Sequence, residues 1–163
     1  PTLRVTSDKN IAAWPDRPWM EEEMRQSQPI HRQGTELAHE LGVRICVGCD
    51  YPGSAHTWKI GDATMWELQE LVGCGLTPME AICASTRTTA QAFRIDDEIG
   101  TLETGKRADL IVVDGNPLED IRTLYDGDNI NIVIKDGKVE SVDDDHCQFY
   151  AIREPQPPDR PQE

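Results

Sequence analysis

The stretch in which a predicted helix leads into a short apolar strand constrains the fold of this chain more than any other feature. His31–Leu41 has the apolar spacing of a helix, and Pro29 is expected to separate it from a shorter helical stretch before it. Gly42 follows, where helices commonly end in a left-handed residue. The run Val43–Val47 then predicts a buried strand that stops at Gly48. A helix joined by one glycine to a buried strand is an αβ unit, which favours a parallel sheet.

Two more helices are predicted after a loop rich in proline and glycine. Thr64 and Glu67 have the spacing of a capping box, so the first of these helices is expected to start there. Thr77 and Glu80 repeat the spacing with a proline at the first helical position, and this second helix is expected to reach Phe93. The chain up to residue 95 is therefore expected to contain one strand, preceded by a helix and followed by two more helices.

The sequence period changes after Asp97, and residues 96–145 are interpreted as a small β unit. About four strands are expected, of which three are the short stretch Ile99–Leu102, the apolar run Ala108–Val113 and the alternating run Ile130–Lys135. Asp136-Gly137 predicts a two-residue hairpin turn that returns the chain along the fourth strand. Residues 146–163 are rich in proline and poor in apolar side chains, so they are expected to form a disordered tail.

Length and charge exclude several classes of protein. The 163 residues suffice for one domain or two small ones, whereas an eight-stranded α/β barrel needs about 250. A formal net charge of −14 argues against binding to nucleic acid or to an anionic membrane surface. No apolar run approaches the length of about 18 residues that suggests a transmembrane helix, and no signal peptide is visible. Five irregularly spaced cysteines do not form a disulfide framework, so reduced thiols in a cytoplasmic protein are expected.

Asp50 is the strongest candidate for chemistry. It lies just past the predicted strand, at the end of a parallel strand where α/β folds place ligands, and a carboxylate there can bind a divalent metal or take a proton from water. The alternative is that Asp50 only caps the following turn. His56 lies in the loop after it and is a candidate substrate contact or an ordinary exposed histidine. Cys46 and Cys49 have redox-pair spacing, but the first cysteine lies inside a strand and no second pair exists, which favours core packing.

Four segments resemble the C-terminal third of the metal-dependent amidohydrolases, in the imidazolonepropionase-like and prolidase-like branch. They read GVRICVGCD, ELQELVGCGLTPMEAICASTRTTAQAF, IGTLETGKRADLIVVDGNPLEDI and VIKDGKV, and they fall in order between residues 42 and 139. The resemblance implies an α/β fold in which residues 1–95 are the last two β/α units of a TIM-type barrel and residues 96–145 a small β-sandwich portion. Asp50 matches the aspartate that in this family binds the metal, often zinc, and acts as general base, while His56 falls in a loop that often faces substrate.

The departures from the family pattern indicate an incomplete hydrolase. The H-x-H motif and the later histidines that the resemblance leads one to expect are absent. Catalytic zinc needs about three protein ligands, which one carboxylate cannot replace. The chain is therefore interpreted as the C-terminal fragment of a hydrolase that cleaves an amide-type C–N bond in a small molecule, inactive alone and prone to self-association through the open barrel edge. The alternatives are a truncated, non-catalytic interaction module or one subunit of a split hydrolase.

Overall fold

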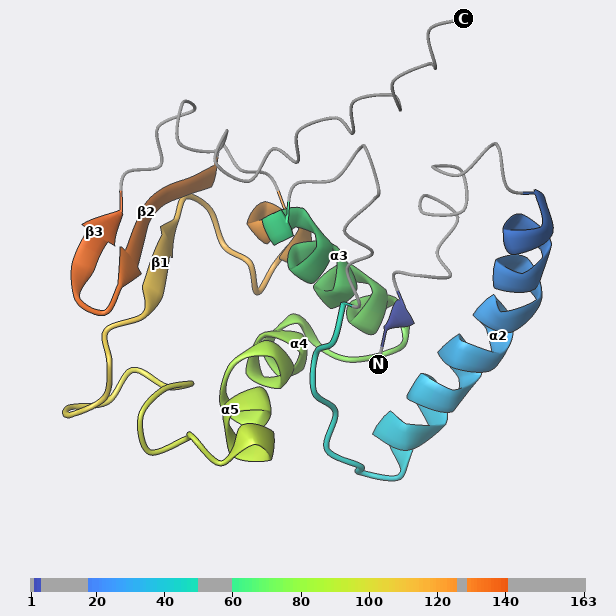
Figure 1. The fold of residues 1–163 in the computed structure, drawn as a ribbon, viewed down its shortest axis with the longest axis horizontal. Coiled ribbons are helices and arrows are strands. Elements are labelled where there is room, and N and C mark those ends of the chain that lie inside the picture. Colours follow the sequence, from blue (N-terminus) through green and yellow to red (C-terminus); the bar gives the residue numbers. More distant parts are fainter. Residues whose placement is uncertain (1, 4–17, 50–59, 126–128, 141–163) are drawn as a thin grey trace, which may run out of the picture.

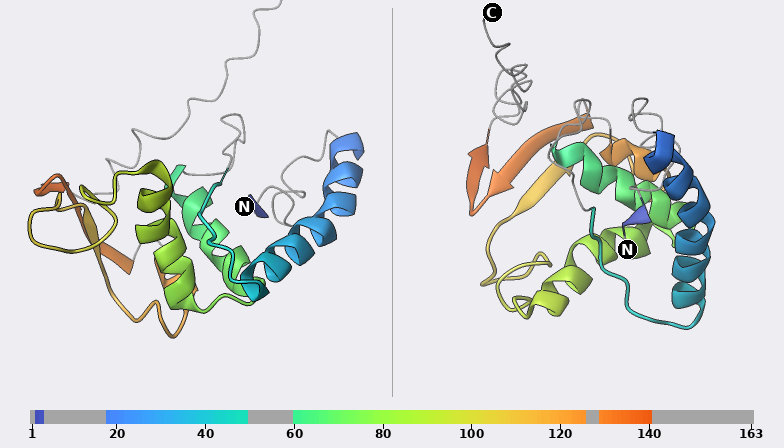
Figure 2. Two further views of the ribbon diagram at one scale, coloured as in Figure 1. Left: turned by 90° about the horizontal axis from the view of Figure 1, so that it is seen from below. Right: turned by 45° about the vertical axis from the view of Figure 1, so that its right-hand side comes forward.

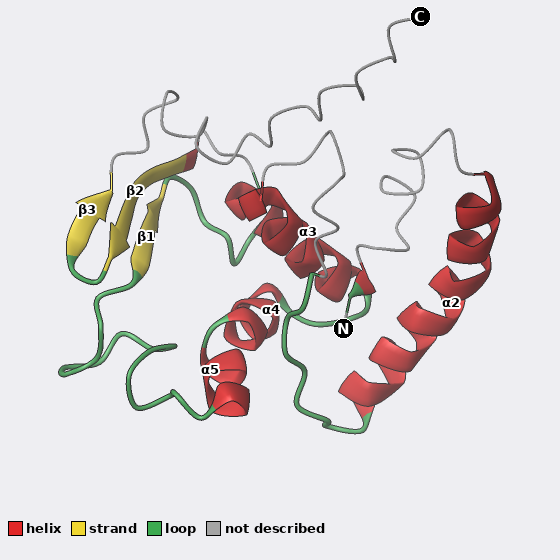
Figure 3. Ribbon diagram, in the orientation of Figure 1, coloured by secondary structure: helices red, strands yellow, loops and turns green. Residues whose placement is uncertain are grey.

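The computed structural model describes residues 2–3, 18–49, 60–125 and 129–140 of the chain. Helices form one part of the molecule and a small sheet forms the other (Figures 1 and 3). The elements are α2 (Pro18–Glu40), α3 (Ile60–Gly73), α4 (Pro78–Ser85), α5 (Arg87–Phe93), β1 (Leu110–Val113), the 3₁₀ helix η2 (Ile121–Leu124), β2 (Ile130–Lys135) and β3 (Lys138–Glu140).

The buried core lies where α3 meets α4, η2 and the start of the chain. Leu71 of α3 is completely buried. Leu3 is 2% exposed in the same cluster, although it lies 64 or more residues away in sequence from most other members. The remaining buried members are Leu68, Cys74, Leu76, Ala81, Ala84, Ile121 and Leu124. The buried residues of α4, Ala81 and Ala84, are small and allow the close approach of α3.

The helix α2 is a single element of 23 residues that contains Pro29 in its interior. The prediction that Pro29 divides it was wrong, because a proline costs one backbone hydrogen bond but does not prevent the flanking turns from continuing the helix. The predicted end is confirmed. Gly42 has a φ of +69°, and the amides of Gly42 and Val43 bond to the carbonyls of His39 and Ala38 at 3.0 and 2.9 Å, which closes the helix in a Schellman arrangement.

The helix α4 starts with the cap that the sequence predicts, but the single predicted helix is broken between α4 and α5. Thr77 Oγ1 accepts from the amide of Glu80, and the Glu80 carboxylate accepts from the Thr77 amide, so this capping box is confirmed. The expected continuous helix to Phe93 is instead two helices. Thr86 departs from helical geometry, with φ −115° and ψ −93°, and its amide and its hydroxyl both donate to the carbonyl of Ile82, at 3.1 and 2.7 Å.

The sheet has three antiparallel strands in the order β1-β2-β3. Ile111 pairs with Val133, and Ile134 with Val139. The predicted hairpin turn is confirmed, since Asp136 and Gly137 both have positive φ values, 51° and 73°. Residues 99–102 form no strand, so three of the about four expected strands are present among the described residues.

Residues 43–49 form an extended segment with no strand partner among the described residues. The predicted buried strand is therefore wrong, both as a strand and as a buried element. Val43 is exposed, and residues 45–49 are only half-buried. A strand needs a neighbouring strand to satisfy its backbone, and here the Val47 amide instead reaches the Ala84 carbonyl of α4 at 3.3 Å. The predicted parallel sheet is accordingly not found in the described part, whose sheet is antiparallel. Figures 1 and 2 show this segment leaving the end of α2 and running between α2 and the pair α4–α5.

Candidate functional site

The two predicted site residues, Asp50 and His56, lie outside the described residues. The structure does describe both flanks of their loop, residues 43–49 on one side and α3 on the other. The contacts of these flanks fix both ends of the loop that carries Asp50 and His56.

The extended segment 43–49 is fixed to three helices. Cys46 Sγ lies 3.6 Å from the Thr88 carbonyl of α5, and Cys49 Sγ lies 3.7 Å from Thr64 Oγ1 of α3. The two thiols thus contact different helices. This arrangement supports the packing interpretation of the C-x-x-C spacing over a redox pair.

Glu67 is the polar residue of this region that sequence reasoning misplaced. The prediction that it caps a helix starting at Thr64 was wrong, because α3 begins at Ile60 and Glu67 lies in its middle. Its side chain is 0% exposed, and Oε1 accepts a hydrogen bond of 2.9 Å from the Leu3 amide. The signal was available in the sequence: Ala63 and Leu71, four residues before and after Glu67, belong to the buried face of the helix.

Charged side chains join α2 to α3. Arg32 Nη1 lies 2.7 Å from Glu70 Oε2, and Arg32 Nη2 donates to the Gly73 carbonyl at 2.8 Å. Trp66 Nε1 donates to the other Glu70 oxygen at 3.0 Å. Nearby, burial raises the pKa of the Cys74 thiol, which keeps this core cysteine protonated and unsuited to act as a nucleophile.

The described residues do not fit a metal site. Among them, no group of three or more histidine, cysteine, aspartate or glutamate side chains is close enough to hold a metal ion. No catalytic step through a metal can be built from this part of the chain, and any further ligands must come from residues that the structure does not describe or from other polypeptide.

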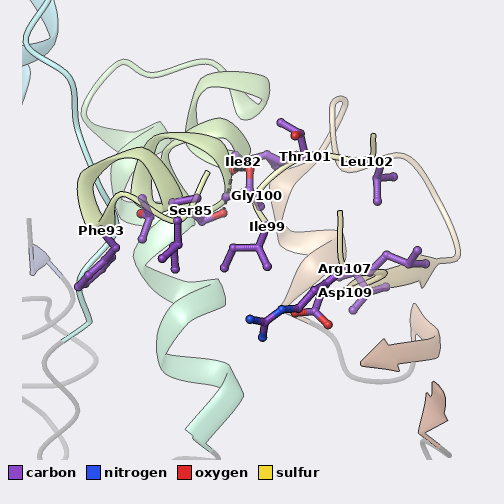
Figure 4. Close-up of a pocket in the computed structure, with 15 residues that line it drawn as sticks. Ile82, Ser85, Phe93, Ile99, Gly100, Thr101, Leu102, Arg107 and Asp109 are labelled. Atoms are coloured by element: carbon purple, nitrogen blue, oxygen red, sulfur yellow. Dashed lines mark hydrogen bonds between the residues drawn. The ribbon is translucent and has the colours of Figure 1, made fainter. Parts of the chain in front are cut away.

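A cavity of about 600 Å³ separates α4 and α5 from β1 and the segment before it (Figure 4). Its lining is mainly apolar, with Ile82, Phe93 and Ile99 among its members. The hydroxyls of Ser85 and Thr86 both bond to the Ile82 carbonyl, and that of Thr89 to the Ala84 carbonyl. These hydroxyls thus donate hydrogen bonds to carbonyl groups of the helices. The cavity lining contains no histidine or thiol to activate a nucleophile.

Comparison with known proteins assigns the family. Residues 25–139 match the model of the amidohydrolase family, and the chain belongs to this family. The resemblance noted in the sequence is thereby confirmed, and with it the membership of a family of hydrolytic enzymes. The described residues contain no helix long and apolar enough to cross a membrane.

Individual relatives are similar over only part of their length. The imidazolonepropionase of Brevibacillus brevis is 33% identical over 104 residues, which are 61% of this chain and 23% of that protein. The imidazolonepropionase of Alkaliphilus oremlandii is 34% identical over the same shares of the two chains. A solved Xaa-Pro dipeptidase with bound methionine superposes with a TM-score of 0.73 at 33% identity, over 86% of this chain and 34% of that one. The chain thus spans about a quarter of the curated relatives it matches.

Proposed function

We propose that this chain is the Asp50-bearing part of a metal-dependent hydrolase that cleaves an amide or cyclic amide C–N bond in a small molecule. The observation that carries the proposal is the family match over residues 25–139, which spans the flanks of the Asp50 loop. Relatives named imidazolonepropionase and Xaa-Pro dipeptidase support a substrate with a cyclic amide or a dipeptide bond.

The proposed roles within the chain follow the family resemblance. Asp50 is one ligand of a divalent metal, for which zinc is the candidate, and a proton acceptor for the attacking water; His56 contacts the substrate. Residues 1–95 supply the last two units of a TIM-type barrel, residues 96–145 a portion of a β-sandwich, and residues 146–163 a tail. Catalytic zinc needs about three protein ligands, and the described residues hold no metal-binding cluster, so the proposal takes the other ligands from barrel strands of further polypeptide that carry the missing histidines.

The test measures metal content and hydrolysis for the chain alone and after mixing with a relative's barrel that lacks the corresponding segment. The chain alone is expected to hold no stoichiometric metal and to hydrolyse neither Xaa-Pro dipeptides nor imidazolone propionate. Mixing should restore hydrolysis, and Asp50→Asn should abolish it, while Asp97→Asn serves as the matched control. Stoichiometric zinc in the chain alone, or full activity with Asp50→Asn, would contradict the proposal.

A self-associating, non-catalytic module is the second candidate, and one surface favours it. Trp19, Ile30, Leu37 and Leu41 are 54–71% exposed. Their spacings of 11, 7 and 4 residues return to one side of α2 within about 40°. Arg32 contacts α3 from the opposite side of the helix. An apolar stripe of this kind is where a second copy would pack.

Light scattering over a range of concentrations tests this candidate. Self-association through the stripe predicts a particle mass that falls toward that of one chain when Leu37 is replaced by glutamate. Replacement of His31, which is exposed on α2 outside the stripe, about 100° around the helix from Ile30, by glutamate is the control and should leave the mass unchanged. A monomer at every concentration would exclude the second candidate and leave the hydrolase proposal untouched.

A further inference from the structure

Glu67 is a carboxylate placed where the sequence pattern of α3 calls for an apolar residue. The side chain is 0% exposed and is among the largest completely buried side chains described. Its neighbours at intervals of four residues, Ala63 and Leu71, are equally buried. Burial of a carboxylate is unfavourable unless hydrogen bonds compensate, and an apolar residue of similar volume in such a position is often as stable or more so. Stability alone therefore does not account for Glu67.

The hydrogen bond of Glu67 joins two parts of the chain that are far apart in sequence. Oε1 accepts from the Leu3 amide at 2.9 Å, across 64 residues. The Leu3 side chain is 2% exposed and packs in the core cluster against which Ile45 and Val47 also lie. A backbone donor captured by a buried acceptor fixes position along the chain, which apolar packing alone specifies poorly.

A second polar contact is made one turn earlier on the same helix. Thr64 Oγ1 lies 3.7 Å from Cys49 Sγ, and Cys49 directly precedes Asp50. Thr64 and Glu67 are three residues apart, so their side chains share a face of α3. This face thus holds both the beginning of the chain and the end of the extended segment 43–49.

We propose that Glu67 is a positioning residue. Its buried carboxylate sets the register of residues 2–3 against α3 and, through the shared core, the placement of the segment that leads into Asp50. The catalytic consequence rests on the proposed hydrolase function, whereas the register itself is a property of this chain without metal or substrate.

The experiment measures two local reporters in the full chain. One is the hydrogen-exchange rate of the Leu3 amide by NMR, and the other is the alkylation rate of Cys49, read by mass spectrometry of its peptide. Glu67→Met removes the acceptor and keeps the volume, and it is expected to speed Leu3 exchange about ten-fold. Cys49 alkylation should also rise, while cooperative unfolding is retained. Glu67→Gln keeps an acceptor oxygen and should restore both rates to those of the parent.

Two further variants keep the test decisive. Glu70→Gln changes the neighbouring acidic residue, which bonds Arg32 and Trp66, and should leave the Leu3 rate unchanged. Glu67→Asp keeps the charge but shortens the side chain, so it should speed Leu3 exchange even if Glu67→Met does not fold.

Three results would overturn the proposal: parental Leu3 exchange in both Glu67→Met and Glu67→Asp, parental Cys49 alkylation in a folded Glu67→Met, or a Glu67→Gln variant as fast as Glu67→Met. Neither reporter depends on hydrolysis. Failure of the proposed function would be seen in a different measurement, as hydrolytic activity that survives in Asp50→Asn.

Discussion

The helical part of this chain buries its apolar side chains more completely than the sheet does. α3 and α4 enclose a core in which Leu71 is completely buried, together with Leu3 from the start of the chain. In the sheet, β3 is exposed throughout, and apolar residues such as Ile111 and Val139 are 39% and 70% exposed. The comparison shows that the described sheet depends mainly on backbone pairing and its hairpin turn, with Val113 of β1 as its contact with the buried core, whereas the helical part is held by contacts between residues distant in sequence.

The difference in burial should appear directly in the free energy of unfolding. Leu71→Ala empties a completely buried position and is expected to cost about 2–5 kcal/mol. Val139→Ala, in the exposed β3, is the matched truncation and should change stability by about 0.5 kcal/mol or less. Urea unfolding followed by circular dichroism checks both. Similar losses for the two variants would mean that the sheet is covered in solution, by a second copy or by other residues.

The connection between the two parts is tested at Gly100. This residue has a φ of +94°, and an added Cβ would lie 2.6 Å from Ala90 Cβ and 3.3 Å from Arg87 Cα of α5. Gly100→Ala is therefore expected to cost about 2 kcal/mol or more, from backbone strain together with the clash.

Gly105 provides the control, since its φ is +95° and nothing lies within 4 Å of an added Cβ. Gly105→Ala should cost only the backbone strain, about 1 kcal/mol. Thermal unfolding of the two variants gives the comparison. Equal losses would show that α5 and the segment after it are not packed together as the structure has them.

The smallest effect is expected in the electrostatics of the hairpin. Asp109 accepts hydrogen bonds from Lys135 Nζ at 2.5 Å and from the Asp136 amide at 2.7 Å, and these bonds lower the pKa of its carboxyl. Because the folded pKa lies below the unfolded value of about 3.9, the stabilisation is present above that value. It is lost as the pH falls through the folded pKa.

The measurement is a titration of the Gly137 and Lys138 amide shifts from pH 6 downward. The parent should show a transition below about pH 4, and Asp109→Asn should remove it. Asp97→Asn, outside the sheet, should leave the transition in place. If the transition persists in Asp109→Asn, another carboxyl group causes it. The Asp109–Lys135 contact would then not stabilise the hairpin.

The sequence predicted best those features that a few neighbouring residues control. The Thr77 cap, the end of α2 at Gly42 and the Asp136-Gly137 turn are all confirmed, since each depends on the backbone preference or hydrogen bonds of adjacent residues. The family was also predicted correctly from short segments. The roles of Asp50 and His56 stay predictions, because both residues lie outside the described part.

The failures have a common physical cause. Pro29 interrupts no helix, Thr86 breaks a predicted one, and residues 43–47 form no strand, because each outcome depends on contacts that local propensity does not contain. The sequence by itself determined the Thr77 cap, the Gly42 helix end, the hairpin turn and the family. Only the tertiary structure decided the place of Glu67: its spacing from Thr64 matches a capping box, yet the packing of Leu3 against α3 buries it and gives it a backbone amide to bind.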